Sequence, residues 1–249
     1  MKSKKFIWLA LTSVFVLNML AVAPASAAEP EFGRCKKEAG SFKDPKCDEG
    51  GGTEFNWVPL KAGEEVKFES TSGVGVLETA SLERIHCQTD KDAGETKGPK
   101  EDLVVVRFFE CESSGFKCMS KGAAAGEIVT NELESELGYI NAAKHEVGLD
   151  LKPSGELFVE FECVGGIVKV KTRGSVIGRI TPVLEMSNEF TLAFKKVSNP
   201  CTQEIERFEG ELKDTLETSK NGGAFEGACE ETTDTIKFSP AGEKLEIKG

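Results

Sequence analysis

The sequence predicts an all-β fold, either an antiparallel β-sandwich or a barrel-like roll, stapled by disulfides. Three observations lead to this class. Short runs of alternating apolar residues are separated by turn residues, which is typical of half-buried strands. Only short stretches have helical spacing, so no helices alternate with the strands as an α/β fold requires. The chain of 249 residues also has eight cysteines, an even number that suits paired thiols in an exported protein.

Residues 1–27 have the three-part pattern of a secretory signal peptide. Three lysines precede the uncharged stretch 6–23, and the small residues Ala25 and Ala27 suit cleavage after Ala27. An uncleaved anchor is the alternative, because these 18 uncharged residues just span a bilayer. Pro24 and the small residues favour cleavage. We therefore expect a secreted protein, extracellular or in the cell envelope, without a membrane anchor in its mature form.

The charge balance restricts the class of partner. The chain has 31 Lys and Arg against 42 Asp and Glu, a formal charge of -11. Cleavage after Ala27 removes three lysines, which leaves 28 bases and 42 acids, a charge of -14 over 222 residues. An acidic chain does not attract phosphate backbones, so we expect no nucleic-acid partner. The expected partner is an unidentified extracellular or cell-envelope ligand.

Beyond the signal peptide we expect two regions. Residues 28–53 are polar and glycine-rich and predict an irregular, cysteine-containing segment, stapled rather than packed. Residues 54–249 predict one β-rich domain. Residues 103–109 form a continuous apolar run, which predicts a strand covered on both sides. Alternation predicts further strands at Val66 and Phe68, Phe190 to Phe194, Ile236 and Phe238, and Leu245 and Ile247.

Two stretches fit either a helix or a strand. Val129, Leu133 and Leu137 have helical spacing when followed by Ile140, and strand spacing when followed by Tyr139. Leu212 and Leu216 pose the same ambiguity. We favour strands at both places because the neighbouring segments are strands. By contrast, residues 94–100 are charged and predict a surface loop.

Gly165 and Gly166 predict a β-hairpin. A two-residue Gly-Gly loop suits a primed turn, in which both positions have positive φ. This register pairs Phe161 with Val170 and places Glu160 opposite Lys171. It also gathers the apolar side chains on one face, whereas a slip of one residue would place Lys against Phe. Core packing and charge pairing therefore agree on a single register.

The cysteines predict four disulfides rather than a zinc site, because no C-x-x-C pair is present. Eight cysteines allow 105 pairings, so spacing alone does not determine them. Our preferred scheme is Cys35–Cys47, Cys111–Cys118, Cys201–Cys229 and Cys87–Cys163. The structural cysteines are Cys35, Cys47, Cys87, Cys111, Cys118, Cys163, Cys201 and Cys229.

No catalytic residue, cofactor or metal ligand is assigned from the sequence. The two histidines, His86 and His145, lack a partner motif, and no G-x-S-x-G, EF-hand or P-loop pattern occurs. Asp44, Asp48 and Glu49 are clustered but irregular, and predict an acidic surface rather than a calcium site. Whether any acidic cluster binds calcium stays open at this point.

Certain strings resemble a family of uncharacterised secreted proteins from actinobacteria. They are residues 31–35 (EFGRC), 111–118 (CESSGFKC), 122–131 (GAAAGEIVTN) and 147–151 (VGLDL). The resemblance extends from about Glu31 to the end. It implies an exported, β-rich protein and no assigned activity, so no functional residue follows from it.

These observations favour a secreted protein with a non-catalytic binding or structural role; whether it is an enzyme stays open, with the weight against. One alternative is a glycan hydrolase that uses two carboxylates. Another is a carbohydrate-binding module that uses Phe55, Trp57 and Tyr139. Candidate acids for the hydrolase are Glu132, Glu134, Glu136, Glu160, Glu162, Glu209, Glu211 and Asp214.

Overall fold

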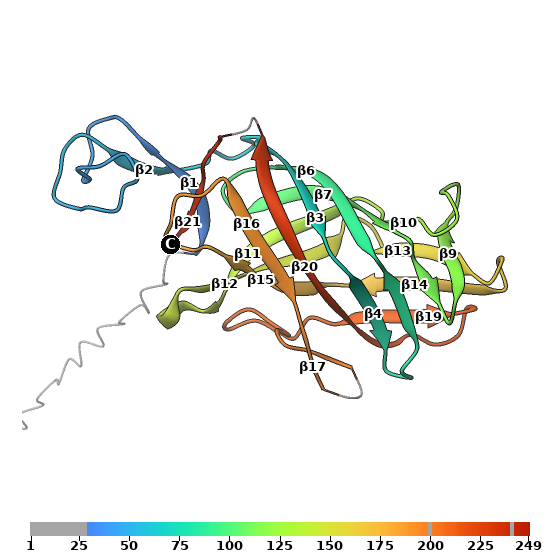
Figure 1. Cartoon of the computed structure of the whole chain (residues 1–249). Helices are drawn as coiled ribbons and strands as arrows, with labels where there is room; N and C mark the ends of the chain where they lie inside the picture. Colours follow the sequence, from blue (N-terminus) through green and yellow to red (C-terminus); the bar gives the residue numbers. More distant parts are fainter. Residues whose placement is uncertain (1–28, 199–200, 240–241) are drawn as a thin grey trace, which may run out of the picture.

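The computed structural model describes residues 29–198, 201–239 and 242–249, which form an almost entirely β-stranded molecule (Figure 1). The predicted signal peptide, residues 1–27, lies outside the described residues. Eight strands form a closed antiparallel barrel, named ring one. In order of pairing, ring one consists of β16 (Glu189–Phe194), β15 (Val176–Thr181), β12 (Glu146–Pro153), β11 (Leu133–Asn141), β7 (Glu101–Phe109), β6 (Thr89–Thr96), β3 (Lys67–Ser72) and β20 (Glu226–Ser239), which pairs again with β16. The predicted all-β class and its barrel-like alternative are confirmed.

The long strand β20 also belongs to a second circuit of paired strands, named ring two. Its C-terminal part pairs with β3 and β16 in ring one, and residues 226–231 pair with β19 and β4. Its 14 residues span about 45 Å when extended, enough to pass through both circuits (Figure 1). Ring two consists of β20, β19 (Leu216–Lys220), β14 (Val168–Gly174), β13 (Val159–Cys163), β9 (Phe116–Ser120), β8 (Glu112–Ser113), β5 (Arg84–Cys87) and β4 (Gly75–Thr79).

The remaining elements lie outside the two rings. A three-stranded sheet has the order β2 (Asn56–Pro59), β1 (Glu31–Lys36) and β21 (Glu246–Lys248). The short pair β17 (Lys196–Ser198) and β18 (Thr202–Gln203) projects from the barrel, β10 (Ile128–Val129) pairs with β7, and η1 (Ala142–Lys144) is a single 3-10 turn.

The N-terminal segment is more ordered than predicted. Residues 28–53 were expected to be irregular, but they include β1, and Phe32 of this strand is 3% exposed. The Phe32 ring packs edge-to-face on Phe190 and Phe238, with ring centroids 6.0 and 5.8 Å apart. Burial of this ring at one end of ring one outweighs the polar composition of the segment around it.

Alternation along the strands determines what fills ring one. In β7, Val104 and Val106 are buried inside, whereas Leu103 and Val105 are half-buried and Arg107 is exposed. The expectation that this strand is covered on both sides is therefore wrong, because only its inner face is fully buried. The ambiguous stretch at Leu133 is a strand, β11, as favoured from the sequence.

The predicted hairpin register is confirmed from Glu160 to Cys163, whereas Val164 and Ile167 belong to the turn. Phe161 pairs with Val170 and Glu160 with Lys171, and their charged groups lie 3.8 Å apart. Gly165 and Gly166 have φ values of 61° and 88°, as a primed turn requires. The loop predicted at residues 94–100 differs, because its first three residues continue β6.

All eight cysteines form disulfides, and the preferred pairing is half right. Cys35–Cys47 and Cys201–Cys229 are confirmed. The other two bonds are Cys87–Cys111 and Cys118–Cys163, so the expected Cys111–Cys118 and Cys87–Cys163 bonds are wrong. Cys118 lies directly opposite Cys163 in the β9–β13 register, which places these two side chains together and leaves Cys111 for Cys87. Within the described ranges, no helix has the length and apolarity needed to span a membrane.

Candidate functional site

Ring one encloses a cavity between its phenylalanine-filled end and ring two. Of the 21 residues that line it, 18 are buried. The cavity volume that water can occupy is about 40 Å³. One water needs roughly 10–15 Å³ by this measure, so there is room for a few waters or one small ion, and none for a sugar ring.

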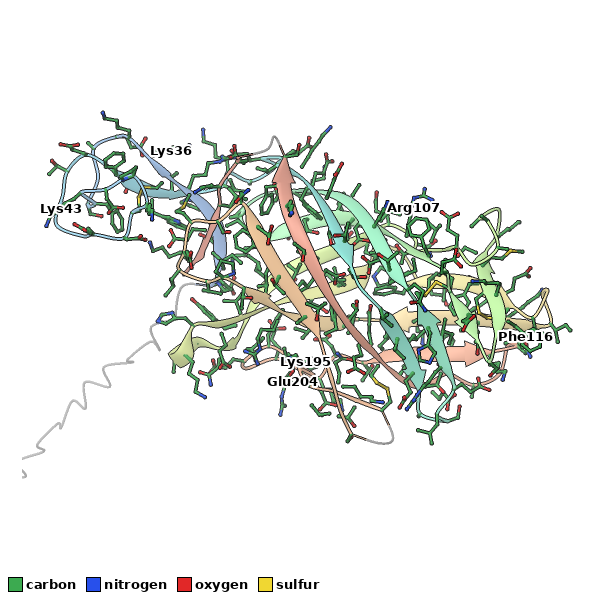
Figure 2. The ribbon with its side chains drawn as sticks, viewed as in Figure 1. Lys36, Lys43, Arg107, Phe116, Lys195 and Glu204 are labelled. Atoms are coloured by element: carbon green, nitrogen blue, oxygen red, sulfur yellow. A yellow bond between two sulfur atoms is a disulfide. The ribbon has the colours of Figure 1, made fainter. Side chains whose placement is uncertain are left out.

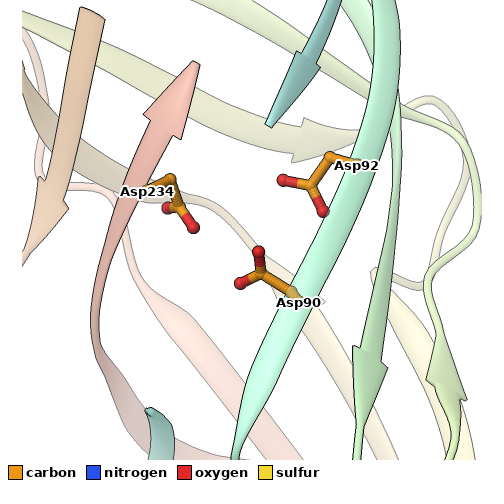
Figure 3. Close-up of side chains that lie close together, drawn as sticks. All are labelled: Asp90, Asp92 and Asp234. Carbon is orange, nitrogen blue, oxygen red and sulfur yellow. The ribbon is translucent and has the colours of Figure 1, made fainter. Parts of the chain in front are cut away.

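Three aspartates from two strands point into this cavity (Figure 3). Asp90 and Asp92 are two residues apart in β6, and Asp234 belongs to β20. Residues two apart face the same side of a strand, so both β6 carboxylates face inward with the buried positions of that strand. One carboxylate oxygen from each residue lies within 4.8 Å of the others.

Strand β3 lies between β6 and β20 and contributes two serines. Ser70 is paired with Asp92 across one edge, and Ser72 is paired with Asp234 across the other. The Ser72 hydroxyl donates to Asp90 Oδ2 and accepts from the Asp90 amide at 3.1 Å. This contact holds Asp90 against β3 and orients it toward Asp234.

Four further polar atoms of the cluster lack partners among the described residues. Oδ1 of Asp90, Asp92 and Asp234 is buried without a hydrogen bond, and so is Ser70 Oγ, whose residue is 4% exposed. A buried polar group without a partner costs on the order of 1–3 kcal/mol. Four such atoms in one cavity are therefore costly unless protons or a bound ligand satisfy them.

The environment of these aspartates strongly disfavours the ionised form of their carboxyl groups. Burial raises the pKa of Asp92 to about 8 and that of Asp234 to about 10, and the neighbouring Asp90 adds to both shifts. Burial also raises the pKa of Asp90, although the Ser72 hydroxyl opposes this. On the boundary with ring two, burial and then Asp90 raise the pKa of Glu230 to about 8.

Among the residues that the structure describes, no positive side chain lines the cavity beside these acids. Five of the residues that line the cavity are acidic, and none is Lys, Arg or His. The fifth acid is Asp102, whose pKa burial raises to about 6. Such a cluster satisfies its electrostatics either by keeping protons or by holding a cation among hard oxygen ligands.

The sequence predicts no such cluster. The signal available is the pattern Asp90-Lys91-Asp92, in which the acids fall on one face of a strand. However, the charged residues 94–100 predict a loop, and this conceals the extent of β6. Asp234 comes from the other end of the chain, and only the closure of ring one brings it to β6.

The acids proposed for a hydrolase do not gather around the cavity. None of the eight lines it. Glu136 and Glu160, for example, form ion pairs with Lys152 and Lys171, with side chains about half exposed. Both side chains therefore lie on outer faces of the molecule, away from the cavity.

The aromatic residues proposed for carbohydrate binding do not form an exposed row. Phe55, Trp57 and Tyr139 are each half-buried. Phe55 and Trp57 belong to the β2 region, whereas Tyr139 lies on β11. The Trp57 ring is packed closely on the backbone of Gly33, where a Cβ would approach it to 2.4 Å.

The clustered acids near the N-terminus have a local structural role. The Asp44 carboxylate accepts hydrogen bonds from the amides of Lys46, Asp48 and Glu49, at 2.7 to 3.1 Å. These bonds lower the pKa of Asp44. Asp44 thus caps a turn, and its oxygens are already occupied.

A second feature is a surface hollow at the open end of ring two. Its volume is about 660 Å³. Leu82, Phe116 and Val168 line it, and His86 is part of its wall. Leu82 and Phe116 are 54% and 53% exposed. Figure 2 shows Phe116 at the end of the molecule opposite Lys36 and Lys43. His145, the other histidine, follows η1 and lies outside both sites.

Comparison of the chain with protein-family models, curated proteins and solved structures gives no match. The resemblance to secreted actinobacterial proteins therefore stays a prediction.

Proposed function

We propose that this protein is an exported, non-catalytic binding domain that contacts an extracellular or cell-envelope ligand through the open end of ring two. The observation that carries this proposal is the placement of the two features. The carboxylates with raised pKa values are enclosed in a cavity too small for an organic substrate, whereas the larger hollow is open and presents Leu82 and Phe116 beside charged side chains. The open hollow therefore suits the binding of a ligand, whereas the small enclosed cavity does not suit the hydrolysis of a glycan.

Export is the second part of the proposal. The signal-like pattern of residues 1–27 and four disulfides support it, because paired thiols persist in oxidising compartments. Exposed large apolar residues around one hollow are typical of interaction surfaces. The hydrolase alternative requires an open cleft with two carboxylates. The cavity of ring one does not provide one; Glu160 and Glu162 do line a surface hollow, but Glu160 is paired there with Lys171.

A binding experiment with two matched variants tests the surface. Phe116→Asp places a charge in the hollow, whereas Leu212→Asp alters a leucine that is 89% exposed elsewhere. We expect the mature protein and Leu212→Asp to capture the same ligand from a cell-envelope fraction, and Phe116→Asp to lose it. Equal capture by both variants contradicts this surface.

An activity panel tests the non-catalytic assignment. We expect no turnover of glycans or esters by the mature protein. Hydrolysis that disappears in Asp92→Asn or Glu230→Gln would establish the carboxylate hydrolase instead.

A further inference from the structure

We propose that Asp90, Asp92 and Asp234 bind one calcium ion inside ring one, with the Ser70 hydroxyl as an additional oxygen ligand. The proposal is independent of the ligand that occupies the hollow of ring two. It also differs from the clustered acids Asp44, Asp48 and Glu49, whose turn is already satisfied internally.

The spacing of the carboxylates fits calcium. Ca²⁺ binds oxygen at about 2.3–2.6 Å, so two ligands on opposite sides of one ion are about 4.6–5.2 Å apart. The three aspartates offer oxygens that all lie within 4.8 Å of one another. Oxygens at this spacing are close enough to share one ion.

Ser70 gives a second, independent indication of a ligand. It belongs to β3, lines the same cavity and is 4% exposed. Its Oγ makes no hydrogen bond of normal length to a described residue, although the hydroxyl lies near enough to Asp92 to oppose the rise in the pKa of that carboxyl. In the pairing register it is directly opposite Asp92. A cation bound by Asp92 would accept this oxygen as a ligand and remove the cost of burying it unpaired.

Charge and space both favour calcium over other occupants. The wall has five acids and no basic side chain, so a positive ion supplies the missing counter-charge. Mg²⁺ dehydrates reluctantly and keeps several waters in a strict octahedral geometry, whereas Ca²⁺ accepts six to eight oxygen ligands in flexible geometry. A cavity of about 40 Å³ leaves little room for a hydrated ion. Carboxylate and hydroxyl oxygens also suit a hard cation better than zinc or copper.

Metal content and thermal unfolding of the mature, disulfide-bonded protein test the proposal. Because the site is enclosed, the protein is warmed with EDTA to remove metal and then equilibrated with Ca²⁺ or Mg²⁺. We expect one Ca²⁺ per chain after dialysis. We also expect 10 mM Ca²⁺ to raise the melting temperature by roughly 5–10 °C, and Mg²⁺ to raise it much less.

Two variants identify the ligands. Asp92→Asn/Asp234→Asn is expected to lose both the bound Ca²⁺ and the temperature shift. It should melt at or above the temperature of the metal-free wild type, because it removes two buried carboxyl groups whose ionisation is costly in this cavity, and this separates lost binding from failed folding. Asp150→Asn, which alters a buried aspartate that does not line the cavity, should keep both responses.

The proposal is overturned if wild-type protein retains no Ca²⁺ and its melting temperature ignores the ion. It is equally overturned if the double variant binds Ca²⁺ as the wild type does. An equal response to Mg²⁺ would overturn the assignment of calcium as the cation.

Discussion

Gly138 of β11 lies directly opposite Gly148 of β12, and the ring of Phe208 covers both on the outer face of ring one. A Cβ on Gly138 would lie 2.3 Å from Phe208 Cδ2, and one on Gly148 would lie 3.0 Å from Phe208 Cε1. Phe208 itself is 6% exposed and packs with Ile177 and Ile205 as a small second core. Because neither glycine has a side chain, the Phe208 ring packs directly on their backbone and holds its segment against the barrel.

Gly138→Ala should displace the Phe208 ring and destabilise the protein. Overpacking of this kind costs about 1–3 kcal/mol, which corresponds to a fall in melting temperature of roughly 3–10 °C for a chain of this size. Gly227→Ala is the matched control, because this glycine also lies in a strand, β20, but has open space around it. Equal melting temperatures for the two variants would contradict the packing argument.

Peptide mapping without reduction should recover the bond Cys118–Cys163 and the bond Cys87–Cys111. Replacing both Cys118 and Cys163 by serine opens a 45-residue loop in the unfolded chain, and the expected cost is about 4 kcal/mol. The same change at Cys35 and Cys47 releases a loop of 12 residues and should cost about 3 kcal/mol. A peptide that joins Cys111 to Cys118 would contradict the pairing.

The stability of the protein should depend on pH through Asp150. Burial raises its pKa to about 7; Asp214, Glu136 and Glu211 add to the shift, and Lys152 opposes it. Between pH 4 and pH 7 the folded state holds a proton that the unfolded state has lost, so stability from this group falls as pH rises, by on the order of 1 kcal/mol per pH unit.

Denaturant unfolding from pH 4 to pH 8 measures this contribution. The difference in the free energy of unfolding between wild type and Asp150→Asn should change across the window and level off above pH 7. Asp48→Asn, at an exposed position, serves as the reference and should track the wild type. A constant difference for Asp150→Asn would show that its proton is not taken up on folding.

Phe32→Ala should destabilise ring one although it lies in the N-terminal segment. The ring is 3% exposed and contacts Phe190 and Phe238. Removal of a buried phenylalanine costs about 3–5 kcal/mol. Phe116→Ala, at a 53% exposed position, should change the free energy of unfolding by less than about 0.5 kcal/mol. If the two variants unfold at the same denaturant concentration, β1 does not contribute to the barrel core.

Local patterns predicted much of the strand structure. The register of the Gly-Gly hairpin was predictable, because its turn, its charge pairs and its apolar face all depend on neighbours in sequence. The β16 strand, with Phe190, Leu192 and Phe194 facing inward, was predictable for the same reason. The β1 strand was not, because its polar composition hides one phenylalanine whose partners, Phe190 and Phe238, are remote in sequence.

The candidate calcium site shows the same division. The sequence places Asp90 and Asp92 on one face of any strand that contains them. It gives no reason to associate them with Asp234 or Ser70. Those residues meet because β3 pairs with β6 on one edge and with β20 on the other.

The sequence alone determined that this protein is all-β, contains paired cysteines and has one hairpin of defined register, since period-two alternation and turn residues act over a few residues. Only the tertiary structure decided how the strands close into ring one, how β20 serves both rings and which cysteines bond. The tertiary structure also brings the buried acids Asp90, Asp92 and Asp234 together in a cavity that no described basic side chain lines. These outcomes depend on contacts between distant segments, which hydrophobic burial and strand pairing select together and which no local pattern encodes.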